Sequence, residues 1–323
     1  MLNNKTILIT GGTGSFGKKC TEIILERFKP KKLIIFSRDE LKQYEMSQVF
    51  ADDAMRFFIG DVRDKERLYR AFSGVDYVIH AAALKQVPTA EYNPFETVQT
   101  NIIGAQNVIN VAIDQKVKRV VALSTDKAAN PINLYGATKL CSDKLFIAGN
   151  AYVGRNQSTF SVVRYGNVLG SRGSVLPAFQ KKRATGVLPV TDPRMTRFWI
   201  TLEQGVDFVL KCMERMVGGE LFIPKIPSMS IMDLAKAIGP ECRIEIVGIR
   251  PGEKLHEVMI SADDARNTDE FSDHYVIKPA FRFFGRRYNN GNGKPVPEDF
   301  EYNSGTNTWW LSIEELRQLV QTP

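Results

Sequence analysis

Four proton-handling side chains lie within the segment STDKAANPINLYGATK, residues 124–139. Asp126 and Lys127 stand side by side, and Lys139 follows Tyr135 at a spacing of four. Because residues i and i+4 share one face of a helix, a phenol and an ammonium should meet there. A nearby ammonium favours the phenolate, which predicts a Tyr135 pKa below the ordinary value of about 10. Such a phenol can take a proton from an alcohol while a hydride leaves for a cofactor.

A glycine-rich segment near the start of the chain, TILITGGTGSFGKKC, has the order strand, turn, helix. Gly12, Gly14 and Gly17 fit GxGxxG, and Gly11, Gly14 and Gly17 fit the related GxxGxxG. These glycines permit a tight turn, close approach of backbone to a pyrophosphate, and close packing of helix on strand. Amides at the start of the helix then face the anion. We therefore expect a dinucleotide to contact Gly11, Thr13, Gly14, Ser15, Phe16 and Gly17.

Three later strand ends supply the other expected cofactor contacts. Ser37, Arg38 and Asp39 follow the second apolar run, and Lys42 lies one helical turn further on. An acidic residue at this point ordinarily binds a ribose hydroxyl, whereas a cation accommodates a 2′-phosphate. With a hydroxyl and two cations here, NADP is favoured over NAD, although Arg38 could be a solvated charge. The remaining expected cofactor residues are Asp61, Val62, Ala81, Ala82 and Lys85, together with Tyr135 and Lys139.

Short apolar runs alternate with helical patterns in the first half of the chain. The expected strands are 6–10, 32–36, 57–59, 77–81, 119–123 and 158–164, and a long helical pattern covers 94–115. Continuous apolar strands between helices predict a parallel sheet covered on both faces. Right-handed crossovers then give a doubly wound α/β fold of the Rossmann type.

The pattern changes after residue 167, where glycine, proline and arginine become frequent. We expect residues 1–167 to form an NADP-binding Rossmann domain, to which 198–238 return. That return comprises a helix over 202–216, a strand over 220–223 and a helix over 230–238. Residues 168–197 and 239–323 should form a smaller, mostly C-terminal substrate-binding lobe, with a strand at 244–249. Its final helix, 312–320, has Ser312 and Glu315 at the spacing of a capping box.

Composition narrows the class of protein. The chain has 323 residues, 43% of them hydrophobic and 24% charged, with a net charge of +7. Its basic residues are dispersed and it has no nucleic-acid motif, so a small anionic ligand is favoured over nucleic acid. Four separated cysteines indicate reduced thiols, and three histidines without ligand spacing indicate no metal site. Neither a signal peptide nor an apolar run of about 18 residues is present, so we expect a cytoplasmic protein without a membrane partner.

Over nearly its whole length the chain resembles the extended short-chain dehydrogenase/reductase superfamily. Its motifs are similar to those of the soluble, inverting UDP-N-acetylglucosamine 4,6-dehydratases (5-epimerising) of pseudaminic acid biosynthesis: TGGTGSFG, GDVRD, HAAALK, STDKAANPINLYGATK, RYGNVLGSRGSV and RPGEKLHE. Membrane-bound and capsule-making relatives carry Met in place of Tyr135, and retaining dehydratases carry Asp-Glu in place of Asp126-Lys127. Both differences point to the soluble inverting type.

The resemblance implies roles for individual residues. Tyr135 would be the base at the C4 hydroxyl, Lys139 would tune it and hold the cofactor ribose, and Thr125 would hydrogen-bond near C4. Asp126 would be the acid at C6 and Lys127 would handle the C5 proton, although these two could exchange roles. The UDP-sugar would contact Lys85, Asn167, Val168, Arg172, Thr196, Arg250 and Glu253. Relatives form hexamers or dimers, which implies a homo-oligomer.

Three other functions stay open at this point. A nucleotide-sugar 4-epimerase would share the cofactor site and Tyr135, but it would need no Asp–Lys pair after the fifth strand. A retaining 4,6-dehydratase would give the opposite configuration at C5. An NADP-binding, redox-sensing regulator could dispense with both Tyr135 and Lys139, so the presence of both argues for an enzyme.

Overall fold

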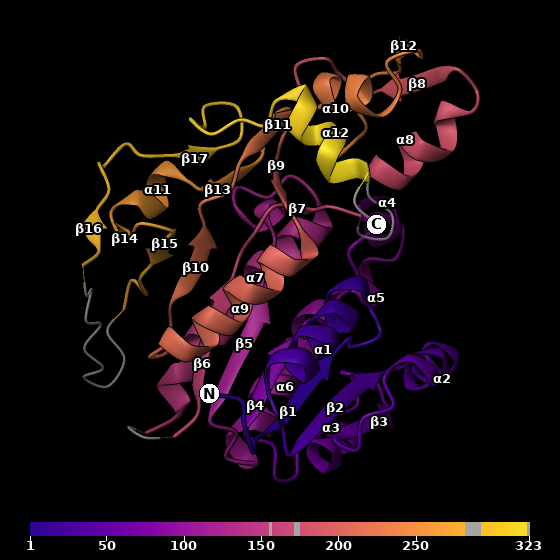
Figure 1. Ribbon diagram of the computed structural model, residues 1–323. Coiled ribbons are helices and arrows are strands. Elements are labelled where there is room, and N and C mark those ends of the chain that lie inside the picture. Colours follow the sequence, from indigo (N-terminus) through magenta and orange to yellow (C-terminus); the bar gives the residue numbers. More distant parts are fainter. Residues whose placement is uncertain (155–156, 171–174, 282–291, 322–323) are drawn as a thin grey trace.

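The computed structural model describes residues 1–154, 157–170, 175–281 and 292–321. Within this part of the chain, the largest sheet has the strand order β16-β14-β15-β10-β6-β5-β4-β1-β2-β3 (Figure 1). Its parallel portion consists of β1 (Thr6–Thr10), β2 (Lys32–Ser37), β3 (Met55–Ile59), β4 (Tyr77–His80), β5 (Arg119–Leu123), β6 (Thr159–Val163) and β10 (Leu221–Pro224). The order 3-2-1-4-5-6 is that of a doubly wound dinucleotide-binding sheet, so the predicted fold class is confirmed.

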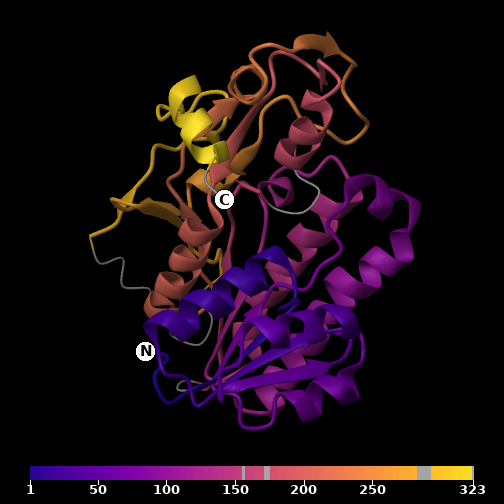
Figure 2. The ribbon, with the colours of Figure 1, turned by 45° about the vertical axis from the view of Figure 1, so that its right-hand side comes forward.

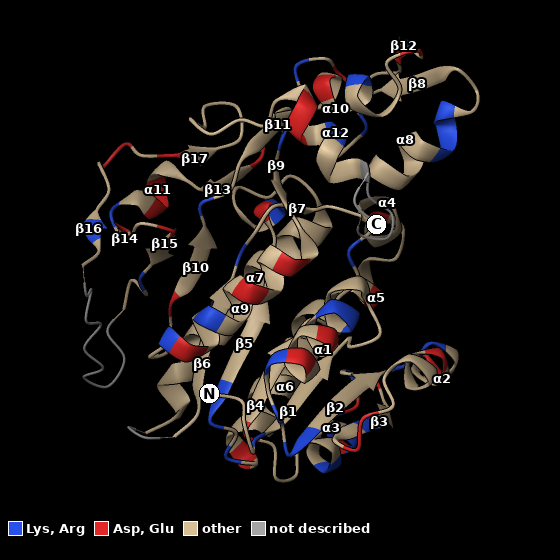
Figure 3. Cartoon of the chain, in the orientation of Figure 1, with Lys and Arg blue, Asp and Glu red and all other residues tan. Residues whose placement is uncertain are grey.

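The inner strands are apolar because both faces of the sheet are covered. β1 is buried at all five positions, and β4 is buried at all four. Figure 3 shows β1, β4 and β6 without charged residues, while blue and red residues intermix on the outer helices. The charges of this basic chain are therefore dispersed over its surface helices.

Two groups of helices pack around the sheet (Figures 1 and 2). Helices α1 (Ser15–Arg27) and α9 (Leu202–Arg215) contact each other, and Thr201 and Gln204 form a capping box at the start of α9. A second group consists of α3 (Lys65–Ala71), α6 (Gly104–Asp114) and α7 (Leu134–Gly149). The other helices of this half are α2 (Glu40–Val49), α4 (Val87–Tyr92), α5 (Pro94–Val98), η2 (Asp126–Ala128) and η3 (Asn150–Tyr152).

The helix expected over 94–115 is interrupted by a π-helical turn, η1 (Gln99–Ile103), between α5 and α6. Such turns commonly occur at functional sites. Here the side chain of Asn101 accepts a hydrogen bond from Leu84 N (2.8 Å) and donates to Leu84 O (2.9 Å) and Thr138 Oγ1 (3.0 Å). The turn thus ties the loop before Lys85 to helix α7.

A second hydrophobic core forms the smaller lobe. It contains side chains of α8 (Val175–Arg183), β8 (Val187–Val190), α10 (Ile231–Ile238) and α12 (Ile313–Gln321). Two small sheets belong to this region: β7 (Asn167–Val168) with β9 (Thr196–Ile200) and β11 (Ser228–Ser230), and β8 with β12 (Arg243–Ile246). The predicted cap of the last helix is confirmed, because Ser312 Oγ accepts from Glu315 N and Glu315 accepts from Ser312 N.

The chain divides between the two cores differently from the expected ranges. Helix α10 packs in the second core and does not return to the Rossmann sheet. Conversely, β14 (Thr268–Glu270), β15 (His274–Ile277) and β16 (Lys294–Pro295) extend the large sheet as antiparallel strands beyond β10. Periodicity shows that a helix or strand is amphipathic, but it does not show which of two cores receives the apolar face. The remaining elements are β13 (Val258–Ile260), α11 (Ala262–Ala265) and β17 (Tyr302–Asn303).

The helices of the described residues are either too short or too polar to span a lipid bilayer.

Candidate active site

A cleft of about 920 Å³ lies between the carboxyl ends of the parallel strands and the smaller lobe. This is the usual ligand site of an open α/β sheet. From the predicted cofactor set it is lined by Gly11, Thr13, Gly14, Ser15, Phe16, Gly17, Ser37, Arg38, Asp39, Lys42, Asp61, Val62, Ala81, Ala82 and Lys85. From the predicted catalytic and sugar-binding sets it is lined by Thr125, Asp126, Lys127, Tyr135, Lys139, Asn167, Val168, Arg250 and Glu253.

Two glycines of the turn at one end of the cleft lie too close to neighbouring backbone to carry a Cβ. Gly11 has a φ of +64°, and a Cβ there would lie 2.9 Å from the backbone of Ala82. A Cβ at Gly17 would overlap the carbonyl of Gly12. Below the turn, Thr10 Oγ1 contacts His80 Nδ1 (2.8 Å) and accepts from the amides of the residues after β4. The turn is therefore a rigid backbone cradle, which fits the approach of a pyrophosphate.

The residues after β2 are engaged with one another at the edge of the cleft. Asp39 caps helix α2 by accepting from Lys42 N (3.0 Å), and its carboxylate also pairs with the Lys42 ammonium. Arg38 is half exposed and lies 3.5 Å from Asp61. Burial alone would raise the pKa of Asp61, but hydrogen bonds and the charge of Arg63 outweigh it and lower the pKa. Arg38 is thus the more exposed of the two predicted cations.

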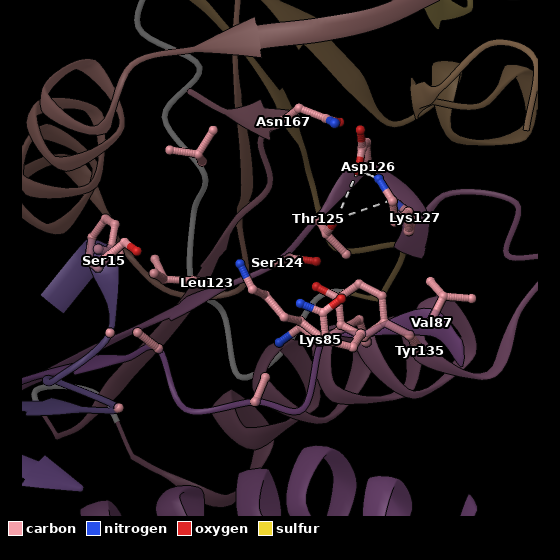
Figure 4. A pocket seen from close by; sticks show the side chains of 18 of the residues that line it. Ser15, Lys85, Val87, Leu123, Ser124, Thr125, Asp126, Lys127, Tyr135 and Asn167 are labelled. Atoms are coloured by element: carbon pink, nitrogen blue, oxygen red, sulfur yellow. Dashed lines mark hydrogen bonds and ion pairs between the residues drawn. The ribbon is translucent and has the colours of Figure 1, made fainter. Parts of the chain in front are cut away.

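The catalytic residues predicted after β5 form a compact turn, η2 (Figure 4). Asp126 Oδ1 accepts from Thr125 Oγ1 (2.8 Å) and from Lys127 Nζ (3.0 Å). On its other side, Lys127 Nζ lies 3.3 Å from Glu257 Oε1. Burial alone would lower the pKa of Lys127, but the charges of Asp126 and Glu257 outweigh it and raise the pKa. Lys127 is therefore an ammonium held between two buried carboxylates.

Tyr135 stands on the first turn of α7, facing this cluster (Figure 4). Asn133 caps the helix as expected, because its side chain accepts from Gly136 N (2.8 Å). Burial raises the pKa of Tyr135 to about 12, although the charge of Lys127 and a hydrogen bond with Thr125 lower it. The expectation that Lys139 brings this pKa below its ordinary value is wrong, since burial dominates and the acting cation is Lys127.

Lys139 is almost fully buried, and two opposing effects act on its pKa. Burial lowers its pKa, and the carboxylate of Asp143, one helical turn further on, opposes that shift. Asp143 Oδ2 also accepts from Ser124 Oγ (2.7 Å) and Arg164 Nη2 (3.2 Å). This buried network joins α7 to the ends of β5 and β6, so it fixes α7, which carries Lys139, relative to η2.

The predicted sugar-binding residues differ in where the structure places them. Lys85, Asn167, Val168, Arg250 and Glu253 line the cleft. Arg172 lies outside the described residues. The Thr196 hydroxyl is turned away into a buried network, where it contacts His256 Nδ1 (2.8 Å) and Ser304 Oγ (2.7 Å).

The charged residue beside Lys127 that the sequence predictions missed is Glu257. It lines the cleft together with Arg197, which the sequence offered as a weaker sugar-nucleotide candidate, and Arg197 Nε lies 3.7 Å from Glu257 Oε1. Glu257 is the last residue of the motif RPGEKLHE, from which only Arg250 and Glu253 were selected. Its burial, with 2% of its surface exposed, was the missing signal, because only folding shows it.

Comparisons with known proteins agree with this geometry. The chain matches the model of a family described as "Polysaccharide biosynthesis protein" over residues 7–279. It is 58% identical, over 328 residues, to a protein of Campylobacter jejuni subsp. jejuni named UDP-N-acetylglucosamine 4,6-dehydratase (inverting), covering 99% of this chain and 98% of that protein. It is 41% identical, over 336 residues, to a protein of Rickettsia canadensis named UDP-glucose 4-epimerase, covering 100% and 97%.

A solved structure also matches along the whole chain. The X-ray structure of Pen from Bacillus thuringiensis superposes with a TM-score of 0.91 at 40% identity, covering 99% of this chain and 98% of that chain. The fold, the cleft and the motifs thus agree with the sequence matches. The chain belongs to the polysaccharide biosynthesis protein family, within the short-chain dehydrogenase/reductase superfamily that includes the inverting UDP-N-acetylglucosamine 4,6-dehydratases.

Proposed function

We propose that this protein is a UDP-N-acetylglucosamine 4,6-dehydratase that inverts C5 and forms UDP-2-acetamido-2,6-dideoxy-β-L-arabino-hex-4-ulose. The product would feed the synthesis of pseudaminic acid, a sugar of surface glycans. The observation that carries the proposal is the Asp126–Lys127 pair, which faces Tyr135 across one cleft. A simple oxidoreductase needs only the tyrosine, whereas expulsion of water from a sugar also needs an acid at C6 and a base at C5.

The cleft fits a nicotinamide dinucleotide because Gly11, Gly14 and Gly17 of the turn after β1 line the same cleft as Tyr135 and Lys139. When bound, that group supplies a hydride acceptor for C4 and a hydride donor for C6. NADP is our proposal because Arg38 stands half exposed at the ribose end, where a guanidinium suits a 2′-phosphate. The carboxylate of Asp39 already accepts a hydrogen bond at the start of α2, so it is less available as an acceptor for a ribose hydroxyl.

The high pKa of Tyr135 suggests a proton relay in place of a stored phenolate. Thr125 interacts with Tyr135 and donates to Asp126 Oδ1. As Tyr135 accepts the proton of the C4 hydroxyl, its own proton can pass through Thr125 to the Asp126 carboxylate. Asp126 then protonates the hydroxyl that leaves C6 as water. The proton lost at C4 is therefore the proton gained by the leaving group, and no outside acid is needed.

Once C4 is a ketone, the C5 proton becomes acidic, and Lys127 is the group we assign to it. The amine removes that proton, and protonation from the opposite face gives the inverted product. Each positioned proton transfer contributes about 10²–10⁴ in rate. In the second half of the cleft, Arg250 and Glu253 would hold the diphosphate and hydroxyls of a UDP-sugar, with Lys85 and Asn167 nearer the hexose.

This assignment also gives the two lobes their roles. The large sheet would carry the cofactor, and the lobe built on α8, α10 and α12 would close one side of the sugar-nucleotide site. We further propose a homo-oligomer that works in the cytoplasm. Cys20 and Cys212 are buried free thiols, as in proteins of reducing compartments.

The test is incubation of the purified protein with UDP-N-acetylglucosamine in heavy water, with catalytic NADP and no added reductant. NMR of the product should show a 6-deoxy-4-keto sugar of arabino configuration with one solvent deuterium at C5. Unchanged substrate would contradict the proposal and leave the regulator as the better account.

The second candidate is a nucleotide-sugar 4-epimerase, which the relatives named UDP-glucose 4-epimerase favour. In the same experiment it would return a 4-epimer that retains oxygen at C6 and acquires no deuterium at C5. A retaining dehydratase would give the xylo configuration with deuterium at C5. The product therefore separates all three chemistries.

A further inference from the structure

Glu257 is the least explained charged residue of the cleft. It stands just before β13, and only 2% of its surface is exposed. Its Oε1 lies 3.3 Å from Lys127 Nζ and 3.7 Å from Arg197 Nε, so it joins two cations from different parts of the chain. The side chain thus contacts the base that the proposed reaction uses at C5.

The backbone around Glu257 is held firmly. Glu257 N donates to Ser304 Oγ (2.9 Å), and Ser304 N donates to Glu257 O (2.8 Å). The hydroxyl of Ser304 is in turn hydrogen-bonded to Thr196 Oγ1 at 2.7 Å. This network explains why Thr196 is buried away from the cleft: it supports the strand that presents Glu257.

The cluster holds more carboxylate oxygens than it has donors for. Within the described residues, Asp126 Oδ2 and Glu257 Oε2 are buried without a hydrogen-bond partner. Buried carboxylates need a proton or a paired charge, because an unpaired buried charge is costly. Asp126 and Glu257 each have one oxygen without a hydrogen bond, and both flank the ammonium of Lys127. A proton can therefore move between this ammonium and either carboxylate.

The resting charge of Lys127 poses a chemical problem. The groups that face it are Asp126, Glu257, Arg197, Lys85, Lys254 and Tyr135. Burial lowers the pKa of Lys127, but the two carboxylates outweigh it, so the amine rests as an ammonium. An ammonium cannot remove a proton from C5. Asp126 cannot accept the proton of Lys127 either, because that carboxylate receives the C4 proton and delivers it at C6.

We infer that Glu257 is a positioning residue that accepts the resting proton of Lys127 and later returns it. This inference depends on the proposed dehydratase function. An N–H bond of Lys127 breaks and an O–H bond forms on Glu257, which leaves a free amine. That amine takes the C5 proton, and the electron pair of the C–H bond stays on the sugar as the enolate.

The cycle then closes without an outside reagent. The enolate expels the C6 oxygen, which leaves as water with the proton of Asp126, and the hydride returns to C6. C5 receives a solvent-exchangeable proton on its opposite face, one proton of the Lys127–Glu257 pair passes to solvent in exchange, and the remaining proton settles on Lys127. Glu257 and Asp126 are carboxylates again, as at the start.

The decisive variant is Glu257→Gln, which keeps the size of the side chain and removes its ability to accept the proton. We expect kcat near neutral pH to fall by about 10²-fold, the lower range of a lost proton transfer. Because the ammonium must then lose its proton to solvent, kcat should rise about tenfold per pH unit in alkaline buffer, whereas the unmodified protein should show a flat profile. The KM for UDP-N-acetylglucosamine should change little.

A second readout separates this role from a structural one. Oxidation at C4 does not use Lys127, so the Glu257→Gln variant should accumulate reduced nicotinamide on mixing with substrate, seen by its absorbance. The matched control is Glu253→Gln, which changes the other glutamate of the same motif and should raise KM without altering the pH profile. Glu257→Asp keeps a carboxylate and should recover activity with a flat profile. Glu257→Ala, which also lacks a proton acceptor, replaces the glutamine variant if that one does not fold.

The inference is overturned if the unmodified protein forms the keto sugar while Glu257→Gln keeps a flat pH profile and accumulates no reduced nicotinamide. It is equally overturned if Glu257→Asp is as impaired as Glu257→Gln, because a carboxylate then makes no difference. If the unmodified protein itself forms no keto sugar, it is the dehydratase assignment that fails.

Discussion

The two ends of the cleft are built on different principles. The cofactor end is made largely of backbone from one continuous segment, in which Gly11 and Gly17 lie too close to neighbouring backbone to carry a Cβ. The proton-transfer end is made of side chains from separate elements: η2, α7, β9 and the start of β13. The first end is fixed by local geometry, and the second by charges that only the complete fold brings together.

This difference shows where each end is vulnerable. An added side-chain atom would displace the backbone of the glycine turn. Such a substitution should lower the affinity for the cofactor and the free energy of unfolding. In a cluster of paired charges, removing one partner leaves the other unpaired. Such a substitution should lower kcat, because the chemical step depends on the pair. Substitutions at the two ends should therefore leave distinct kinetic signatures.

The largest expected effect belongs to the proton-transfer end. Lys127→Met removes the amine that we assign to the C5 proton, so kcat should fall by about 10³-fold or more while reduced nicotinamide still forms, as expected for a lost proton transfer. Lys144→Met, at an exposed position of α7, is the matched control and should leave the rate unchanged. Equal losses in both variants would remove Lys127 from the chemical step.

The next effect belongs to the cradle. Gly17→Ala places a Cβ against the Gly12 carbonyl, and such overpacking should cost about 1–3 kcal/mol of unfolding free energy and weaken dinucleotide binding. Gly205→Ala in α9 meets no atom within 4 Å and should stabilise the protein by about 0.5–1 kcal/mol. Urea unfolding and cofactor titration measure both. A Gly17→Ala protein with unchanged stability and unchanged affinity would contradict the tight packing of α1 on the turn.

The smallest effect concerns which dinucleotide binds. Arg38→Ala should weaken NADP binding by about tenfold, the loss of one charge-assisted contact of roughly 1.4 kcal/mol, and leave NAD binding unchanged. Fluorescence titration with each reduced cofactor measures the ratio. Equal weakening for both cofactors would mean that Arg38 does not recognise the 2′-phosphate.

The same contrast explains how far the sequence could predict the molecule. The alternation of strands and helices and the glycine turn follow from local patterns, so Gly11 to Gly17 and the doubly wound fold class could be derived directly. The pKa of Tyr135 could not, because it depends on burial and on Lys127, not on the helical spacing of Lys139. Glu257 and the burial of Thr196 depend on β9, β13 and Ser304 meeting in space, which no periodicity encodes.

The most direct test of the central claim is the configuration and isotope content at C5 of the product from UDP-N-acetylglucosamine in heavy water. The account predicts a 6-deoxy-4-keto sugar of arabino configuration that carries one deuterium at C5 and forms without added reductant. A product that keeps its C6 oxygen and its original C5 proton would contradict it, because the Asp126–Lys127 pair would then have expelled no water.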